Sequence, residues 1–272
     1  MHYLETGRGD PILFLHGNPT SSYLWRGVVP HVMDKGRCLA LDLIGMGASG
    51  KPDIAYRLVD HVAYVEAFIG ALELDNITLV LHDWGVAVGF TLLARYPEKI
   101  RACAFLEGHL GPIESWADWD EGSRELFGEI RAEGSGERLI LEENLFVETV
   151  LPSGVVRELS EEERAAYRAP FPDAASRKPI LREVRDIPIE GHPADVHDLM
   201  VENRRNLVRS DVPKLLLYAR PGAIIGSHEV AWCQENLSNL EAVDVGEGLH
   251  FLPEDRPGEI GRALATWLEG LG

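Results

Sequence analysis

The sequence predicts an α/β protein, in which a mostly parallel central sheet is flanked by helices and interrupted by a helical insertion. Two observations predict this class. Short apolar runs alternate with longer helical patterns through residues 1–110, and the alternation returns after residue 211. Between residues 112 and 211 the pattern is helical, with no convincing buried strand. We therefore expect a core of residues 1–111 and 212–272 and a helical cap of residues 112–211.

The expected strands are continuous apolar runs rather than alternating ones. Continuous runs are typical of parallel strands that are covered on both faces. They lie at residues 11–15, 38–42, 77–81, 101–106, 214–218 and 240–244. The sheet should therefore be buried between two layers of helices.

The helices between these strands differ in how much of their surface is apolar. Residues 85–96 are apolar nearly all round, which indicates a helix packed deep against the sheet. Residues 58–74 are amphipathic, with one apolar face made of Val59, Val62, Val65, Ile69 and Leu72. In the cap, Ser160 and Glu163 form a capping box and residues 194–208 are amphipathic. A helix over residues 258–268 closes the chain.

Composition excludes several classes of function. The 272 residues include 44 acidic and 26 basic side chains, a net charge of −18, which opposes binding to nucleic acid or anionic membranes. Three cysteines without close spacing do not make a disulfide framework or a zinc site. No signal peptide is evident, and no apolar run approaches the roughly 18 residues of a membrane span. We expect a soluble, cytoplasmic protein; nothing in the sequence indicates its oligomeric state.

Glycines after the second expected strand imitate two nucleotide-binding motifs. Gly45, Gly47 and Gly50 match the spacing of the dinucleotide pattern G-x-G-x-x-G. That pattern requires a helix to begin at the glycines, whereas residues 51–53 continue as a loop. The phosphate-binding P-loop is excluded because Pro52 stands where its hydroxyl residue must be. We therefore expect a tight turn and no nucleotide.

The segment Leu81-His-Asp-Trp-Gly85 carries the strongest chemical signal. A buried strand runs directly into a buried helix, with Asp83 at the bend and glycine two positions later. This is the layout of a nucleophile elbow, with aspartate in place of the serine of esterases. Leu81 departs from the small residue that is common there. Taken alone, Asp83 is equally well explained as a helix N-cap.

Three further segments favour the interpretation of Asp83 as a nucleophile over that of a helix N-cap. His16-Gly-Asn-Pro19 ends an earlier strand, where loop amides could meet the elbow as an oxyanion hole. His250 follows the last strand, the position of a catalytic base, although a loop histidine with no role is the commoner case. Glu107 directly follows a buried run, whereas residues 218–228 contain no acid. A carboxylate that directly follows a buried run needs a partner, so we favour Glu107 as the acid of the site over a solvated loop carboxylate.

Together these segments resemble an α/β-hydrolase of the haloalkane dehalogenase family, in the branch whose triad acid follows the sixth strand. The resemblance covers essentially the whole chain. It is carried by residues 16–25 and 42–47, His82-Asp-Trp-Gly85, Phe105-Leu-Glu107 and Gly248-Leu-His250. It implies an α/β-hydrolase core with a helical cap and, usually, one more strand before residues 1–5.

The resemblance also implies a role for each site residue. Asp83 is the nucleophile, His250 the base and Glu107 its orienting acid, while Asn18 and Trp84 stabilise the halide. The reaction converts a small neutral haloalkane and water into an alcohol, a halide ion and a proton, through an alkyl ester on Asp83. It needs no metal and no organic cofactor.

Two related activities and one non-enzymatic role remain as alternatives. Epoxide hydrolases share the aspartate elbow but need a proton donor from the cap, for which Tyr167 is the candidate. They tend to carry an aromatic residue where this chain has Asn18. Coelenterazine-dependent luciferases of the Renilla type retain the same five site residues. A non-catalytic binding protein would leave an intact nucleophile, acid and base without a purpose.

The cap is expected to shape the substrate cavity. Residues 111–170 hold 15 acidic and 6 basic side chains, so half of the net charge lies in the first part of the cap. We expect mostly solvated helix faces there, and some disfavour toward anionic substrates. By resemblance, the cavity wall should include Trp116, Phe146, Val150, Phe171, Leu207 and Leu249.

Overall fold

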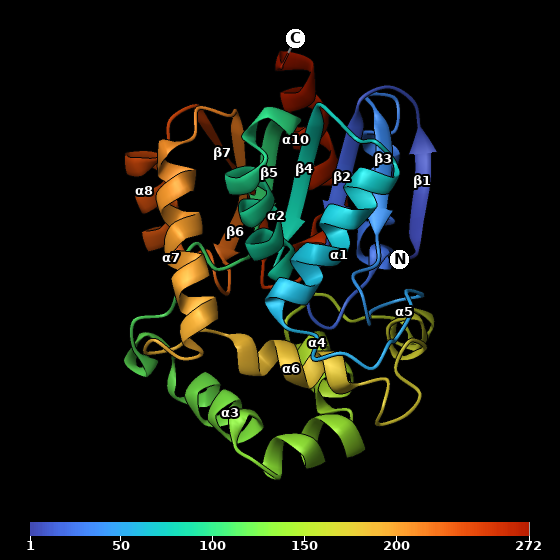
Figure 1. The fold of residues 1–272 in the computed structure, drawn as a ribbon, viewed down its shortest axis with the longest axis vertical. Coiled ribbons are helices and arrows are strands. Elements are labelled where there is room, and N and C mark those ends of the chain that lie inside the picture. The colour runs from blue at the N-terminus through green and yellow to red at the C-terminus, as the bar shows by residue number, and fades with distance from the viewer. Residues whose placement is uncertain (272) are drawn as a thin grey trace.

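The structure, a computed structural model, describes residues 1–271. Within them, seven strands form one sheet in the spatial order β1-β3-β2-β4-β5-β6-β7 (Figure 1). Neighbouring strands are parallel, except that β1 runs antiparallel to β3 at one edge. The strands are β1 (Tyr3–Gly7), β2 (Pro11–Leu15), β3 (Arg37–Leu41), β4 (Ile77–His82), β5 (Ile100–Leu106), β6 (Lys214–Pro221) and β7 (Leu240–Gly248). The predicted, mostly parallel sheet is confirmed.

The last two strands run past their predicted ends at residues 218 and 244. Strand β6 continues to Pro221 and β7 to Gly248, and the pair stays hydrogen-bonded there after a register shift between Tyr218 and Arg220. The apolar pattern stops earlier because β7 is the edge of the sheet, where most of its side chains are at least partly exposed. Polar residues on an edge strand leave no apolar run to recognise.

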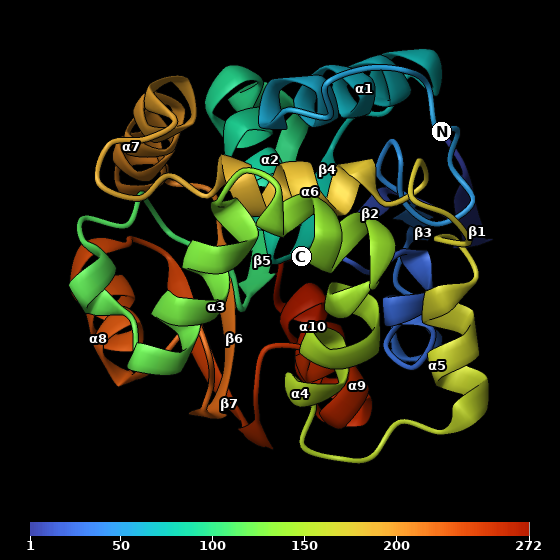
Figure 2. The ribbon, with the colours of Figure 1, turned by 90° about the horizontal axis from the view of Figure 1, so that it is seen from below.

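Two layers of helices cover the sheet (Figure 2). One face packs against α1, α2 and α8, and the other against α10 and two short 3₁₀ turns. The α-helices are α1 (Leu58–Ala71), α2 (Trp84–Arg95), α3 (Glu121–Arg131), α4 (Leu151–Ser153), α5 (Glu161–Arg168), α6 (Lys178–Asp186), α7 (Ala194–Arg209), α8 (Ser227–Asn236), α9 (Leu252–Asp255) and α10 (Pro257–Gly270). The 3₁₀ turns are η1 (Ser22–Trp25), η2 (Val29–His31), η3 (Pro97–Lys99) and η4 (Trp116–Asp118), and two π-helical turns are η5 (Glu137–Glu142) and η6 (Phe146–Val150). None of these helices is long and apolar enough to span a bilayer.

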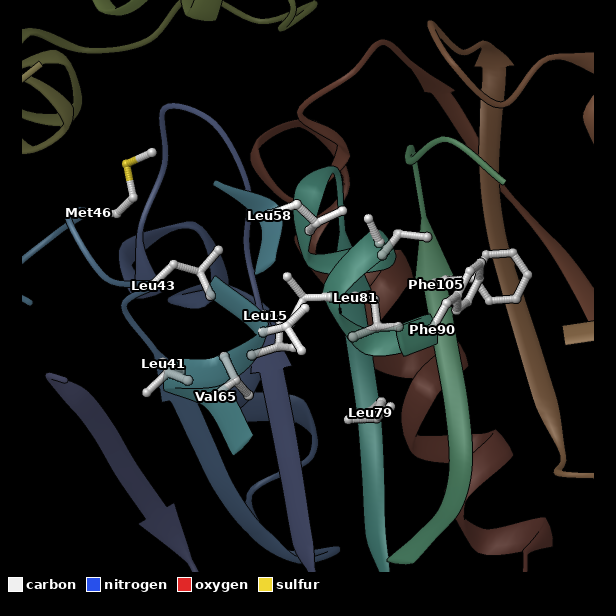
Figure 3. Packing of buried hydrophobic residues seen from close by; sticks show 14 of the residues in the cluster. Leu15, Leu41, Leu43, Met46, Leu58, Val65, Leu79, Leu81, Phe90 and Phe105 are labelled. Carbon is white, nitrogen blue, oxygen red and sulfur yellow. The ribbon is translucent and has the colours of Figure 1, made fainter. Parts of the chain in front are cut away.

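The apolar side chains of the strands divide between two cores, one on each face. In β2, Leu13 and Leu15 enter the core under α1 and α2, whereas Ile12 and Phe14 enter the core under α10. Figure 3 shows the first of these cores, where Leu15 lies between the strands and α1. Every residue of β2 is buried, so both faces need apolar side chains. This burial explains why the strand reads as a continuous apolar run.

The buried face of α1 begins one residue earlier than predicted. Leu58 is buried, whereas Val59 is 46% exposed. Leu58, Val62, Val65 and Ile69 follow the four-three-four spacing of one helical face, and Val59 falls outside that stripe. The prediction that Val59 packs on the core was therefore wrong, and Leu58 takes its place.

The inserted segment contributes helices over the carboxyl ends of the parallel strands (Figures 1 and 2). Helices α3 and α6 lie across this end of the sheet, and Arg57 ties α6 to the core through an ion pair with the buried Asp186. The last helix of the segment, α7, lies along α2 instead. Asn203 of α7 donates hydrogen bonds to Ala87 O and Thr91 Oγ1 of α2.

The glycine-rich stretch after β3 is a loop, as predicted. Helix α1 begins only at Leu58, well beyond Gly50. The loop is organised around the buried carboxylate of Asp42, which accepts hydrogen bonds from the backbone N–H groups of Ser22 at 2.7 Å and Ala48 at 2.9 Å. A Cβ on Gly47 would collide with this carboxylate. Glycine is therefore needed for packing around Asp42.

Candidate active site

Asp83 stands at a sharp bend between β4 and α2. Its backbone has φ 52° and ψ −123°, a conformation that few non-glycine residues adopt. Two glycines make room for the bend. A Cβ on Gly17 would collide with the Asp83 carboxylate, and a Cβ on Gly85 would collide with Leu15 O. The strained residue is thus held by close contacts with the end of β2.

The side chain of Asp83 does not cap α2. Asp83 occupies the N-cap position, but its carboxylate makes no capping hydrogen bond. The bulky Leu81, unusual for an elbow, is accommodated because Gly89 of α2 leaves space where a Cβ would overlap its side chain. The N-cap interpretation of Asp83 is therefore contradicted, and the elbow geometry is present in spite of Leu81.

The Asp83 carboxylate is surrounded by donors. Its Oδ1 accepts a hydrogen bond from the Asn18 backbone N–H at 2.7 Å, and its Oδ2 lies 3.3 Å from His250 Nε2. Burial raises the pKa of Asp83. The hydrogen bond and charge of His250, together with the Trp84 backbone N–H, outweigh burial and lower the pKa to about 2. The carboxylate is therefore ionised at neutral pH.

His250 follows β7 and lies between two carboxylates. Its Nδ1 is 3.6 Å from Glu107 Oε2, an ion-pair distance that is longer than a hydrogen bond. Burial lowers the pKa of His250, but Asp83 and Glu107 more than offset this and raise it to about 9. The backbone of His250 is fixed by His82, whose Nε2 is hydrogen-bonded to His250 O at 2.9 Å. The imidazole is thus held in place from both its ring and its backbone.

Glu107 is completely buried, and backbone amides compensate its charge. It accepts hydrogen bonds from the N–H groups of Ala223 at 3.1 Å, Ile224 at 2.8 Å and Ile225 at 3.3 Å. These amides belong to the loop after β6, in the acid-free stretch 218–228. Three amide donors to one carboxylate replace the hydrogen bonds that water would make to it. This loop was missed in the sequence, where only the absence of acids within it gave a signal.

Asn18 and Trp84 lie beside the carboxylate, at the ends of β2 and β4. The Asn18 side chain donates through Nδ2 to Ile180 O of α6 at 3.1 Å. Trp84, the first residue of α2, lines the adjoining cavity and packs against a small apolar cluster of Ile113, Ile187 and Ile189. Five residues predicted from four separate segments therefore meet at one end of the sheet.

A cavity of about 1030 Å³ opens above these residues, between the sheet and the inserted helices. Of the predicted wall residues, Phe146 and Val150 line it. The other four, Trp116, Phe171, Leu207 and Leu249, are not among its lining residues. Phe171 and Leu207 are instead buried in the packing of the protein. Trp116 packs edge-on against Trp119, with 5.6 Å between the ring centroids, and Trp119 does line the cavity.

Tyr167 does not reach this cavity. It is buried, and its hydroxyl is hydrogen-bonded to Glu254, which also pairs with Arg26 and Arg157. A phenol engaged in an ionic cluster away from the cavity wall is not placed to donate a proton to a substrate. Residues 1–271 also contain no group of three or more His, Cys, Asp or Glu arranged to hold a metal ion.

Comparison with known proteins identifies the family. A family model described as the α/β hydrolase fold matches residues 10–257. The haloalkane dehalogenase of Mesorhizobium japonicum is 49% identical over 271 residues, which cover 98% of this chain and 87% of that protein. The structure of an ancestral haloalkane dehalogenase aligns with a TM-score of 0.97 and 47% identity, over 99% of this chain and 95% of that one. That of a haloalkane dehalogenase from Bradyrhizobium elkani aligns with a TM-score of 0.97 and 45% identity, over 99% and 94% of the two chains. The chain therefore belongs to the haloalkane dehalogenase family of α/β-hydrolases.

Proposed function

We propose that this protein hydrolyses the carbon–halogen bond of haloalkanes, with Asp83 as nucleophile, His250 as base and Glu107 as its orienting acid. One observation carries the proposal. An ionised carboxylate lies at the wall of the cavity, between a backbone N–H of Asn18 at 2.7 Å and His250 Nε2 at 3.3 Å. A carboxylate in these surroundings can attack an sp³ carbon and then be freed by water.

In the first step, Asp83 displaces the halide. Oδ1 is held by backbone N–H, which leaves Oδ2 to attack the carbon that bears the halogen. The new C–O bond forms as the carbon–halogen bond breaks, and the halide leaves with the bonding electron pair. The product is an alkyl ester on Asp83 and a free halide ion.

The leaving halide needs donors that are not acids. The Asn18 NH₂ group gives one N–H to Ile180 O and keeps a second N–H, while the Trp84 indole carries a single N–H donor beside it. Donors placed where negative charge develops stabilise the transition state more than the ground state. We propose that these two side chains hold the halide.

In the second step, His250 activates water. Loss of the Asp83 charge in the ester removes a main cause of the raised pKa of His250, so the ring can become neutral and accept a proton. The hydroxide attacks the ester carbonyl carbon, and the N–H groups of Asn18 and Trp84 hold the resulting oxyanion at Oδ1. As the acyl–oxygen bond breaks, the alkoxide takes a proton from the His250 imidazolium and leaves as the alcohol. The new carboxyl group of Asp83 then gives up its proton and is again a carboxylate, so one proton leaves for each halide.

We propose neutral haloalkanes as substrates and a cap made of residues 112–211 over a core of 1–111 and 212–272. The acidic side chains Glu114, Asp118, Asp120 and Glu229 line the cavity, opposed there by Arg204. Together with the net charge of −18, they disfavour an anionic substrate. A low-salt comparison of equal-sized neutral and carboxylate-bearing bromoalkanes tests this; equal kcat/KM values contradict it.

Bromide and proton release from 1-bromobutane and 1,2-dibromoethane tests the reaction. We expect both in wild type and neither in Asp83→Ala. In His250→Phe we expect one bromide per enzyme and a mass increment of one butyl group on the peptide that carries Asp83. No bromide release, combined with light emission from coelenterazine, would replace this proposal with a luciferase-like oxygenase. Turnover of epoxides without bromide release would point to an epoxide hydrolase.

A further inference from the structure

A histidine that the proposed reaction does not use lines the same cavity. His109 lies two residues after Glu107, on the segment that leaves β5, and its side chain is partly exposed to the cavity. Its ring is nearly parallel to that of Trp119, with 7° between the planes and 6.5 Å between the centroids. Trp119 is packed edge-on against Phe127 at 4.8 Å. The imidazole therefore has a defined orientation on an aromatic wall.

His109 is uncharged at neutral pH. Burial lowers its pKa to about 4, and the charges of Asp83 and Glu229 only partly oppose this. No hydrogen bond contributes to the shift, in contrast to His250. A neutral imidazole has one N–H donor and one nitrogen acceptor. No hydrogen bond of either ring nitrogen is found among residues 1–271, and the residue lines the cavity, so a molecule there can supply a partner.

This pair of hydrogen-bonding atoms stands in a mostly apolar enclosure. Phe127, Phe146 and Val150 line the same cavity. A ligand that covers the imidazole without bonding to it leaves these atoms unpaired, which is costly, so a ligand that supplies a partner gains relative to one that does not. His109 is a poor second base, because a pKa of about 4 leaves it little tendency to take a proton from water.

We propose that His109 forms a polar subsite that selects haloalkanes bearing a neutral oxygen group, such as a hydroxyl, ether or carbonyl, away from the reacting carbon. This inference rests on the proposed dehalogenase function and names the substrate class that the cavity favours. The oxygen group hydrogen-bonds the imidazole, while the carbon–halogen bond is presented to Asp83. An unsubstituted haloalkane of the same length leaves the imidazole unpaired.

The test compares 4-bromobutan-1-ol with 1-bromopentane, in which a methyl group replaces the hydroxyl. The readout is the ratio of their kcat/KM values for bromide release. His109→Phe keeps an aromatic ring on Trp119 but removes both nitrogens, and we expect it to lower the alcohol-to-alkane ratio about five- to tenfold. His109→Gln keeps a donor and an acceptor and should restore part of the preference. An unchanged ratio in His109→Phe overturns the proposal.

A binding measurement separates failure of the subsite from failure of the reaction. In Asp83→Ala, which cannot form the ester, the ring ¹⁵N resonances of His109 are assigned by their loss in Asp83→Ala/His109→Phe. Addition of 4-bromobutan-1-ol should shift these resonances, and 1-bromopentane at the same occupancy should not. If the two ligands shift the His109 resonances equally, the subsite is contradicted. This result does not depend on whether the wild type releases halide. Bromide release without this difference refutes the subsite and leaves the dehalogenase intact.

Discussion

The side chain of Asn18 is oriented by the backbone of Ile180, a residue of the inserted helix α6. Asn18 Nδ2 donates to Ile180 O at 3.1 Å, and only the NH₂ end of an amide can donate to a carbonyl. The contact therefore fixes which way round the amide lies. Asn18 Oδ1 has no hydrogen-bond partner among residues 1–271, so this one bond determines the orientation. A residue that follows the central strand β2 thus depends on the inserted helix α6 for its donor geometry.

Removal of the other proposed halide donor should slow the first step. In Trp84→Phe the cavity wall stays aromatic but loses the indole N–H. We expect the rate of halide formation to fall about 10²–10³-fold, as on removal of one donor to a developing negative charge. Rapid-quench measurement of the bromide burst reports this step. Added bromide should also inhibit the variant less than the wild type.

Trp232→Phe provides the matched control. Trp232 lines the same cavity but stacks with Arg204, 4.2 Å from its ring centre, and lies on α8 rather than at the elbow. The same substitution there should leave the bromide burst within about twofold, since surface changes without a catalytic contact cost little. Equal losses in the two variants would show that aromatic packing, and not the indole donor, matters.

Glu107→Gln should separate the two chemical steps. The first step does not need His250 as a base, so one equivalent of bromide should still be released at nearly the wild-type rate. Hydrolysis of the ester should fall about 10³–10⁴-fold, as when a carboxylate that orients a catalytic histidine is neutralised. Glu229→Gln, at another part of the cavity wall, is the control and should turn over repeatedly. A variant without any burst would contradict the assignment of Glu107 to the second step.

The fold could be predicted because its signals are local. Strands buried on both faces read as apolar runs, and the helix after Asp83 is apolar nearly all round because α2 is buried along most of its length. Errors arose where burial is one-sided. Val59 lies one step outside the buried stripe of α1, and beyond residue 244 β7 has a single apolar side chain, Val245, between polar residues and glycines. Periodicity reports burial, so it fails where burial is partial.

The sequence predicted the side chains of the site but not the backbone groups that hold them. Asp83, Glu107 and His250 were identified from their types and their order along the chain. The amides of residues 223–225 and the carbonyl of Ile180 act through the backbone, so no residue type marks them. His109 is one of ten histidines in the sequence, and only the cavity in the structure distinguishes it from the others. Contacts between segments far apart in sequence account for what was missed.

The pH dependence of turnover should differ from the titration of the free enzyme. Asp83 and Glu107 raise the pKa of His250 to about 9, so the ring is protonated at neutral pH before substrate reacts. The ester has no Asp83 charge, which lowers the pKa of His250 toward its ordinary value of 6.5. Since hydrolysis needs the neutral ring, the acid limb of kcat should lie below the NMR titration midpoint of His250 in free enzyme.

Asp83→Asn imitates this loss of charge without forming an ester. Its His250 resonance should titrate at lower pH than in the wild type, near the acid limb of the wild-type kcat profile. Selective ¹³C labelling of histidine and assignment with His250→Phe make both titrations measurable. Coincidence of the wild-type NMR midpoint with the kcat limb would contradict the role of the Asp83 charge.

A buried carboxyl between α6 and α1 should limit stability. Glu183 of α6 faces His61 of α1 at 3.3 Å; both side chains are buried, and neither has a good hydrogen bond among the described residues. Burial and the negative charges of Asp83 and Asp186 hold the pKa of Glu183 well above its usual range. Burial lowers the pKa of His61 to about 4. Both shifts favour an uncharged pair, with the proton on Glu183.

Replacement of Glu183 by leucine should therefore stabilise the protein, and more so at higher pH. Above pH 4.5 the unfolded state releases the Glu183 proton while the folded state retains it, so wild-type stability falls as pH rises through this window. We expect Glu183→Leu to gain about 1–3 kcal/mol in urea unfolding near pH 8, and less near pH 5. Glu183→Gln cannot ionise and should show the same change in pH dependence, without the gain from apolar contact. His61 is unchanged in all three proteins. A gain from leucine that does not vary with pH would mean that packing, rather than the retained proton, sets the cost of Glu183.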